Sequence, residues 1–329
     1  MKYISCYPFI YSMKRQCPIL LISGTILILT ILVGCSPSNS ELNAVEYAPL
    51  TEGDWKVSTP AEQGLDPILV AELYYNAAKL ETLFGLLVVK NSHLIAERYF
   101  NEGSVEQKAR VQSVTKSIIS AMAGIALDQA FLSSVDQKMI DFFPEVADKI
   151  TDPRKKQITI RHLLQMRAGY PWEESHPVSH LDVKAGEWGQ DAEGHNNGCG
   201  DLHLTARDTA KFGLLYLNDG VYDGNQIVPA DWVHHSLQTY SVNEAFVKRV
   251  GDFSDIGYGY HWWSANVGRH HVNFAWGHGG QLIVLLDAFE LGIVVTAKPF
   301  WKEHGDESWK HEKAIIKLVG KFIDSIPKE

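Results

Sequence analysis

The spacing of hydrophobic and polar residues predicts a helix followed by a β-hairpin near the start of the folded part of the chain. Apolar residues recur at helical intervals along one face between residues 65 and 80: Leu65, Leu69, Leu73, Ala77 and Leu80. The stretches 83–89 and 94–100 are rich in apolar and β-branched residues, and the polar residues 90–93 separate them. Two such stretches with a short polar connection are typical of antiparallel strands.

The middle of the chain is predicted to be mostly helical. Beyond Ser113, apolar residues follow the helical spacing with only small residues between them: Ile118, Ile119, Met122, Ile125 and Ala126. We therefore expect this helix to be largely buried. The stretch 159–166 is also apolar at helical spacing.

A further helix is predicted over residues 205–218. It opens with Thr205 and has Asp208 three positions later, which fits a capping box at a helix start. The pairs Asp219-Gly220 and Asp223-Gly224 then predict two turns.

Strand patterns return in the last quarter of the chain. The stretches 258–264, 281–287 and 291–297 alternate or run apolar, and 312–326 has the pattern of an amphipathic helix. Since strands lie on both sides of a helical middle, we predict an α+β fold with one antiparallel sheet built from distant segments. The helical region, at about residues 107–218, would be inserted between them.

The first 34 residues predict an export signal. The uncharged apolar run 18–34 follows Lys14 and Arg15. The run ends in Leu-Val-Gly before Cys35, and this ending resembles the lipobox of bacterial lipoproteins. The resemblance implies that Cys35 is acylated and anchors the chain to a membrane on the periplasmic or extracellular side. A chance cysteine and an uncleaved membrane anchor are the alternatives.

Composition and charge narrow the class of protein. The chain has 329 residues, of which 45% are hydrophobic and 21% charged, as expected for a globular protein with a full core. The formal charge is −9 and lysines are not clustered, which argues against a nucleic-acid partner. We expect residues 35–55 to be a polar tether and residues 56–329 to form one domain. Cys199, the only other cysteine left after cleavage at the lipobox, is expected to be structural.

Ser113 and Lys116 are the first candidates for chemistry. Residues at i and i+3 share a helix face, so the lysine amine can reach the serine hydroxyl. At a buried helix start, the helix dipole and desolvation both disfavour the ammonium, and a neutral lysine can act as the base for a serine nucleophile. The alternative is an ordinary helix start, since about one Ser-x-x-Lys arises by chance in a chain of this length.

The stretch Trp276-Gly-His-Gly-Gly-Gln281 is the second candidate, because it leads into a predicted core strand. Glycines there let a ligand or another backbone approach closely. His278 could donate a hydrogen bond to a substrate or to the reacting serine. A β-turn with a surface histidine is the alternative.

Four stretches in order resemble the serine β-lactamase and penicillin-binding-protein superfamily, in its esterase-like and 6-aminohexanoate-dimer-hydrolase-like branch. They are VQSVTKSIISAMAGIALDQ, ITIRHLLQMRAGYPW, LTARDTAKFGLLYLNDGVYDGNQIVPADWV and FAWGHGGQLIVLL. The resemblance implies that Ser113 is the acylated nucleophile and Lys116 its general base. It implies that His278-Gly279-Gly280 replaces a Lys-Thr-Gly or His-Thr-Gly motif. The N–H groups of Ser113 and Gln281 would form the oxyanion hole. No metal or organic cofactor is implied.

The chain departs from the superfamily at the second motif, Tyr-x-Asn or Tyr-x-Ser. The segment that carries this tyrosine is not found, so the helical region is expected to be shortened. Tyr170 is the proposed stand-in by position, with the alternative that it only lines the cleft wall. Tyr74-Tyr75-Asn76 fits the spelling but precedes the nucleophile, and we expect it on the surface or in the core.

The histidines do not predict a metal site. His176 and His180 have an i, i+4 spacing, but Pro177 lies between them and no glutamate completes a metal motif. The adjacent pairs 234–235 and 270–271 would point in different directions in regular structure.

These observations predict a membrane-tethered serine hydrolase that forms an acyl-enzyme on an ester or amide. The missing tyrosine leaves a second hypothesis open, a catalytically impaired relative that binds a ligand or a cell-wall fragment. Pocket shape decides among the substrates of such enzymes. The histidine in the third motif makes efficient β-lactam turnover less expected than ester or amide cleavage.

Overall fold

The computed structural model describes residues 36–51, 53, 55–169, 188–190, 194–242, 248–301 and 306–327. The export signal, Cys35, Tyr170, His176 and His180 lie outside these residues. The elements described below belong to one of two compact units, residues 37–329.

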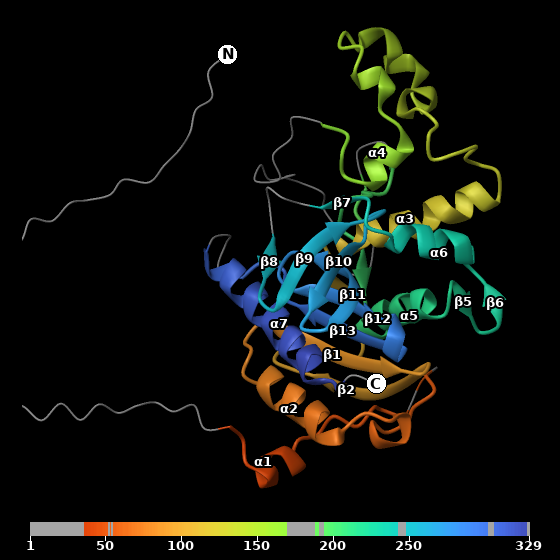
Figure 1. Cartoon of the computed structure of the whole chain (residues 1–329). Helices are drawn as coiled ribbons and strands as arrows, with labels where there is room; N and C mark the ends of the chain where they lie inside the picture. Colours follow the sequence, from red (N-terminus) through yellow and green to blue (C-terminus); the bar gives the residue numbers. More distant parts are fainter. Residues whose placement is uncertain are drawn as a thin grey trace, which may run out of the picture. The chain divides into compact units, whose positions relative to one another are not determined.

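A nine-stranded antiparallel sheet forms the centre of this unit (Figure 1). Its strand order is β2-β1-β13-β12-β11-β10-β9-β7, and β8 also pairs with β9. The strands are β1 Leu83–Lys90, β2 His93–Tyr99, β7 Ser241–Val242, β8 Arg249–Val250, β9 Phe253–Tyr258, β10 Trp263–Val267, β11 His270–Gly277, β12 Gln281–Leu286 and β13 Leu291–Ala297. Because β1 pairs with β13, the two ends of the domain meet in one sheet, which confirms the predicted α+β fold.

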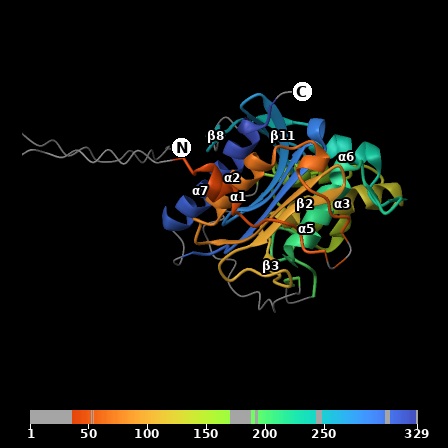
Figure 2. The same ribbon diagram turned by 90° about the horizontal axis from the view of Figure 1, so that it is seen from below.

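Both faces of the sheet are covered by helices, and this explains the continuous apolar strands. Along β12, Leu282, Val284 and Leu286 join one hydrophobic cluster, whereas Ile283 and Leu285 join another. Side chains alternate between faces along a strand, so a strand that is covered on both sides needs apolar residues at every position. Figure 2 shows the helices arranged on the two sides of the strands.

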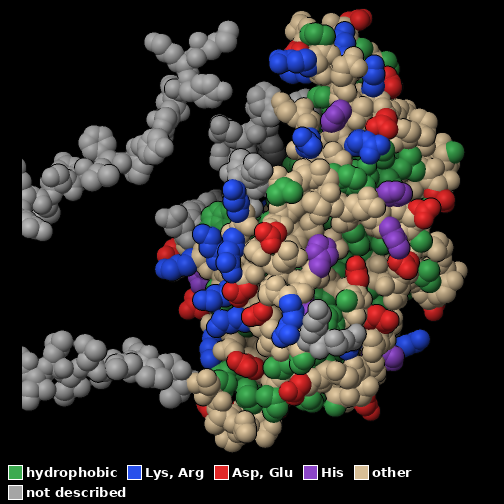
Figure 3. All heavy atoms as spheres, viewed as in Figure 1, with side chains coloured by type: hydrophobic (Ala, Val, Ile, Leu, Met, Phe, Trp, Pro, Cys, Tyr) green, Lys and Arg blue, Asp and Glu red, His purple; other side chains and the backbone are tan. Residues whose placement is uncertain are grey.

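The first face carries α2 (Pro67–Ala77) and α7 (Asp306–Ser325), and α1 (Asn39–Asn43) packs on α2. The second face carries α3 (Val114–Asp128), α5 (Ala206–Leu217) and α6 (Ala230–Leu237). The helix starts follow the expected chemistry, since the Asp66 and Thr205 side chains cap α2 and α5. Figure 3 shows Lys and Arg side chains gathered on the part of the surface that carries α7.

Short elements connect these layers. The 3-10 turns are η1 Ala61–Gln63, η2 Met139–Phe142, η3 Pro144–Lys149, η4 Lys155–Gln157 and η5 Asp287–Phe289, and α4 covers Ile160–Leu164. Two small sheets pair β3 (Ala109–Arg110) with β4 (His203–Leu204) and β5 (Val221–Tyr222) with β6 (Asn225–Gln226). None of the helices in the described ranges combines the length and apolar composition needed to cross a bilayer.

The strand predicted over 258–264 is wrong. β9 ends at Tyr258 and β10 begins at Trp263, and a turn lies between them. His261 has a φ of 59°, and a Cβ on Gly259 would lie 2.3 Å from the Ser236 carbonyl oxygen. The apolar and aromatic composition of this turn concealed it, and β11 was not predicted either.

The predicted buried face of α3 is also wrong. Its buried residues are small, for example Ser117, Ala121 and Gly124, whereas Met122 is 49% exposed. A Cβ on Gly124 would lie 2.3 Å from the Trp232 indole, so the small residues let α3 approach α6 closely. The Trp232 indole N–H completes this contact by donating to the Ser120 carbonyl, at 2.8 Å.

The segment expected to be a tether packs against the domain instead. Leu42 is buried on α1, and the Glu97 N–H donates to the Tyr47 carbonyl at 2.8 Å. The buried Glu97–Arg207 ion pair, 2.7 Å between Oε2 and Nη2, then holds Leu50, whose N–H donates to Glu97 and whose carbonyl accepts from Arg207. Polarity alone misled the prediction, because the polar atoms of this segment are backbone groups that bond to the domain.

Candidate active site

Ser113 lies where the short strand β3 turns into α3. Gln112, just before it, has a φ of 50°, and Ser113 is the first residue with helical backbone angles (φ −66°, ψ −8°). The Ser113 side chain makes no capping hydrogen bond to the helix. Its hydroxyl is therefore not used by the local structure, unlike the Thr205 hydroxyl, which caps α5.

Lys116 is next to this hydroxyl. Its Nζ is 3.0 Å from Ser113 Oγ and donates at 2.8 Å to the carbonyl oxygen of Cys199. The structure thus brings together the two residues that the i, i+3 spacing predicted. In a reaction the direction of the first bond would reverse, with the Ser113 O–H donating to a neutral amine.

The loop around Cys199 is fixed by its neighbours. The Asn197 amide donates to Asp201 Oδ2 at 2.7 Å and accepts from the Cys199 N–H at 3.1 Å. Asp201 is buried and also forms an ion pair with Arg110 on β3. The carbonyl of Cys199 is therefore held toward Lys116. The prediction of a structural cysteine misses this point, since the thiol is exposed and free while its backbone contacts the site.

The stretch 276–281 forms a turn between β11 and β12. Gly279 and Gly280 have φ values of 81° and 92°, which glycine adopts without strain. His278 is one-third exposed, and its ring nitrogens lie 3.2 Å from Glu312 Oε2 and 3.3 Å from Ser308 Oγ, both on α7. Residues 278–280 thus form a turn, as the alternative predicted, and the hydrogen-bond and ion-pair partners described for the imidazole are on α7.

Gln281 begins β12 and lies in the sheet. Its side-chain amide donates to the Ala297 carbonyl at 2.7 Å and accepts from the Ala297 N–H at 3.1 Å. The side chain thus joins β12 to β13 and is not available to a substrate. The assignment of the Ser113 and Gln281 N–H groups to an oxyanion hole stays a prediction.

Gly277 is the residue of this turn that faces the nucleophile's turn. A Cβ on Gly277 would lie 2.4 Å from the Val111 carbonyl oxygen and 3.1 Å from Gln112 Cβ. The end of β11 therefore touches the two residues before Ser113, and only glycine permits this approach. The sequence analysis missed Gly277, although its place before His278-Gly279-Gly280 could have suggested a backbone contact.

His261 is a second residue near the site that the sequence did not indicate. Its carbonyl accepts from Ser117 Oγ on α3 at 2.7 Å, and its N–H donates to the Leu164 carbonyl at 2.9 Å. Burial, together with the nearby charge of Lys116, lowers the pKa of His261 to about 3. The imidazole is therefore neutral at neutral pH.

Two tyrosine positions bear on the second motif of the superfamily. Tyr170, which lies outside the described residues, is the only tyrosine between Tyr99 and Tyr216 in the sequence. Tyr74 is buried on α2, on the opposite face of the sheet, and its hydroxyl donates to the Leu86 carbonyl at 2.8 Å. The expectation that Tyr74-Tyr75-Asn76 is structural is therefore correct.

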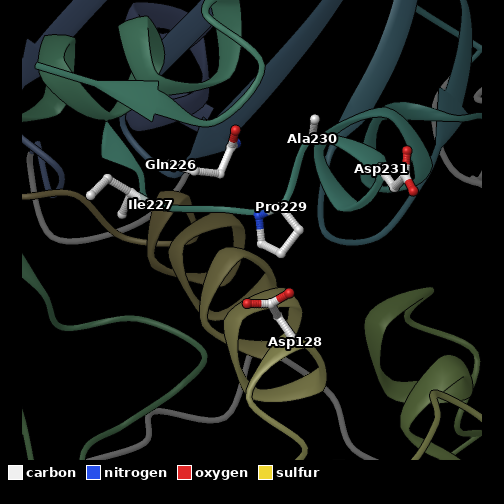
Figure 4. A pocket seen from close by; sticks show the side chains of 6 residues that line it. All are labelled: Asp128, Gln226, Ile227, Pro229, Ala230 and Asp231. Carbon is white, nitrogen blue, oxygen red and sulfur yellow. The ribbon is translucent and has the colours of Figure 1, made fainter. Parts of the chain in front are cut away.

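No group of three or more His, Cys, Asp or Glu side chains within the described ranges is placed to hold a metal ion. Figure 4 shows a hollow at the far end of α3, lined by Asp128, Gln226, Ile227, Pro229, Ala230 and Asp231. The 15 residues of α3 separate it from Ser113 by about 22 Å, at ~1.5 Å per residue. This hollow is therefore not part of the candidate site.

Comparisons with known proteins agree with the fold. The family model described as Beta-lactamase matches residues 84–185, which include Ser113 and Lys116. A putative 6-aminohexanoate-dimer hydrolase from Bacillus anthracis is 16% identical with a TM-score of 0.54, and the match covers 75% of this chain and 81% of that one.

Two other solved structures are similar. A putative β-lactamase from Bacteroides dorei is 15% identical with a TM-score of 0.56, and the match covers 78% of this chain and 97% of that one. A penicillin-binding-protein homologue from Caulobacter crescentus is 12% identical with a TM-score of 0.56, covering 82% and 100% of the two chains. At these identities, structural likeness shows a shared fold.

Proposed function

We propose that this chain is a member of the serine β-lactamase and penicillin-binding-protein superfamily and acts as a serine hydrolase with Ser113 as nucleophile. The superfamily consists typically of hydrolytic serine enzymes. The observation that carries the proposal is the 3.0 Å distance between Ser113 Oγ and Lys116 Nζ at the start of α3. The substrate class is an ester or an amide.

The proposed reaction begins with proton transfer from Ser113 Oγ to a neutral Lys116 amine. The Oγ–C bond then forms, and the carbonyl oxygen becomes an oxyanion that the Ser113 and Gln281 N–H groups and the N-terminus of α3 stabilise. The ammonium of Lys116 returns its proton to the leaving alcohol or amine as the C–O or C–N bond breaks. Water then hydrolyses the acyl-enzyme by the same steps.

The Cys199 carbonyl has a supporting role in this scheme. It accepts one N–H of Lys116 at 2.8 Å and so directs the amine toward Ser113. A neutral amine has two N–H groups and one lone pair, and the bond to Cys199 uses an N–H group and not the lone pair that would take the serine proton. Tyr170 is the proposed proton shuttle between the lysine and the leaving group, in the place of the superfamily tyrosine.

The test is phosphonylation of the full chain by a fluorophosphonate, measured as intact mass. The Ser113 Oγ–P bond forms as the P–F bond breaks, and the adduct mass is expected on the wild type but not on Ser113→Ala. Ser117→Ala is the matched control, because Ser117 is one turn away but donates to the His261 carbonyl. A penicillin probe and p-nitrophenyl acetate test amide and ester classes in parallel.

The second candidate, a ligand-binding protein without turnover, is favoured by one observation. Tyr170 is the only tyrosine available in the sequence between β2 and α5. Loss of a proton-transfer group costs about 10²–10⁴-fold in rate. A folded chain that forms no adduct and leaves p-nitrophenyl acetate intact would contradict the hydrolase and support this candidate.

The membrane anchor stays a separate proposal, because Cys35 lies outside the described residues. It rests on the apolar run 18–34 and the lipobox-like ending. Metabolic labelling with an alkyne fatty acid in a bacterial host is expected to label the wild type and Cys199→Ser but not Cys35→Ser. Labelling of Cys35→Ser would contradict the anchor.

A further inference from the structure

We propose that Glu312 on α7 is a positioning residue that fixes the turn between β11 and β12 beside the nucleophile. This inference rests on the proposed function of Ser113, and it adds a residue from the opposite face of the sheet. The motif analysis gave no role to Glu312, which lies 199 residues after Ser113 in the chain.

Three groups from the end of β11 and the turn after it converge on this carboxylate. The Trp276 indole N–H donates to Oε1 at 2.7 Å, and the Gly279 backbone N–H donates to Oε2 at 2.7 Å. His278 Nδ1 lies 3.2 Å from Oε2. Glu312 is only 1% exposed, so these groups replace water as its partners.

A buried carboxylate is costly unless its oxygens are hydrogen-bonded. At Glu312 both oxygens have a donor, and the two donors are Trp276 at the end of β11 and Gly279 in the turn that follows. The contact therefore cannot form unless the turn has this conformation. Hydrogen bonds to charged groups are stronger than those between neutral groups.

The residue enclosed by these contacts is Gly277. It lies between Trp276 and His278, and it faces the Val111 carbonyl and Gln112 on the other side of the strand. Glu312 thus holds one side of Gly277 while the turn before Ser113 touches the other. A shift of the 276–279 turn would move the backbone that adjoins the nucleophile, and misplacement by about 1 Å can cost about 10²-fold in rate.

Replacement by glutamine separates this role from simple packing. The glutamine amide keeps the size of the side chain but offers one acceptor oxygen and one donor NH₂ group. The NH₂ group would face either the Trp276 indole N–H or the Gly279 N–H, which are both donors. At least one contact is therefore lost without a cavity.

Glu97→Gln is the matched control. Glu97 is also a buried carboxylate with charged and neutral donors, from Arg207, Tyr99 and Leu50, but it lies on β2 and touches no residue of the turn. Both variants are expected to lose stability. Only the turn variant is expected to lose catalysis specifically.

The experiment uses the full chain and compares wild type, Glu312→Gln and Glu97→Gln at a temperature where all are folded. Glu312→Gln is expected to lower the rate constant for phosphonylation by the fluorophosphonate, and kcat for a p-nitrophenyl ester, by about 10–100-fold, with KM within about threefold. Glu97→Gln is expected to keep kcat within about threefold. Equal rates in Glu312→Gln and the wild type would overturn the proposal, as would parallel losses in both variants.

Hydrogen–deuterium exchange across residues 276–281 is measured on the same samples. Faster exchange at Gly279 in Glu312→Gln, but not in Glu97→Gln, is expected from the lost bond. If the wild type forms no adduct, the proposed function fails and the exchange still decides whether Glu312 holds the turn. Unchanged exchange would overturn the positioning role by itself.

Discussion

The helices that cover the two faces of the central sheet bury different kinds of side chain. On the first face α7 buries mainly aliphatic residues such as Ile316, Val319 and Ile323, and the strands and α2 add aromatic rings such as Phe274 and Tyr74. The face under α3, α5 and α6 buries polar and aromatic groups as well, among them Ser117 and Trp262. Gln112 and His261 have a left-handed backbone, and their chain neighbours Val111 and Trp262 belong to the hydrophobic cluster of this second face.

The difference separates a scaffold from a site. The helices and strands of the first face follow the regular periodicity, and its left-handed residues include glycines in turns, such as Gly251 beside Lys317 and Gly280 beside Ile315. The second face combines small residues, buried hydroxyls and left-handed turns, which cost stability and recur at functional sites. Glu312 connects the two, because it is on the regular helix α7 but binds the turn beside the site.

The largest effect is expected at Lys116. Replacing it with methionine removes the base while keeping much of the apolar stem, so the rate at which a fluorophosphonate phosphonylates Ser113 should fall by about 10²–10⁴-fold. Lys321→Met on the solvent-exposed side of α7 is the control, and its Ser113 should react with the fluorophosphonate at the wild-type rate. If Lys116→Met reacts with the fluorophosphonate at the wild-type rate, another group activates Ser113. The assignment of the catalytic base to the second face would then be wrong.

Gly277→Ala is expected to have the next largest effect. Its new methyl group would overlap the Val111 carbonyl, at 2.4 Å, so either β11 or the turn before Ser113 must move. We expect Ser113 of this variant to react with the fluorophosphonate about 100-fold more slowly than in the wild type. Gly292→Ala on β13 is the control, because its nearest neighbour is the end of a flexible Leu217 side chain at 3.2 Å. Similar rates in both variants would show that the approach of β11 to Gln112 does not matter.

The regular elements could be predicted from the sequence because their patterns are local. The continuous apolar runs gave β1, β12 and β13, and the helical spacing gave α2 and α7. The Ser113–Lys116 contact was predictable for the same reason, since i, i+3 residues of a helix adjoin each other whatever surrounds them.

The remaining features depend on contacts between distant segments. The turn at His261 is fixed by Leu164 and Ser117, which lie far away in the chain. Met122 is exposed although its spacing matches a helix face, because α3 packs through Gly124 against a bulky Trp232. Gly277 and Glu312 belong to the same class, and no local pattern marks a residue whose partner is another turn's backbone.

A pair of valine truncations compares the two faces directly. Val114 on α3 and Val319 on α7 are both fully buried, so Val114→Ala and Val319→Ala should each cost about 2 kcal/mol of unfolding free energy. Val114 follows Ser113 in the chain, so only the Val114 truncation should also slow the reaction of Ser113 with the fluorophosphonate, by about tenfold. Urea unfolding and fluorophosphonate kinetics measure the two effects. Equal rates of reaction with the fluorophosphonate in the two variants would contradict the division into a scaffold face and a site face.

The smallest effect expected is a pH dependence of the free energy of unfolding that arises from His261 on the second face. Its pKa is about 3 in the folded protein because burial and the Lys116 charge oppose protonation, against an ordinary value of about 6.5. Between these values the unfolded chain binds the extra proton, so stability is complete above about pH 6.5 and falls as pH drops toward 3. Lowering the pH from 7.5 to 5.5 should therefore lower the free energy of unfolding by about 1.4 kcal/mol through His261. This part of the pH dependence should be absent in His261→Asn.

Asparagine suits the comparison because it tolerates the left-handed backbone at position 261. The chain has 14 histidines, and subtracting the two urea-unfolding curves at each pH cancels the contribution of the other 13. If wild type and His261→Asn lose the same stability on acidification, the imidazole is not held neutral beside Lys116. The site face would then lack the desolvation that a neutral lysine base also requires.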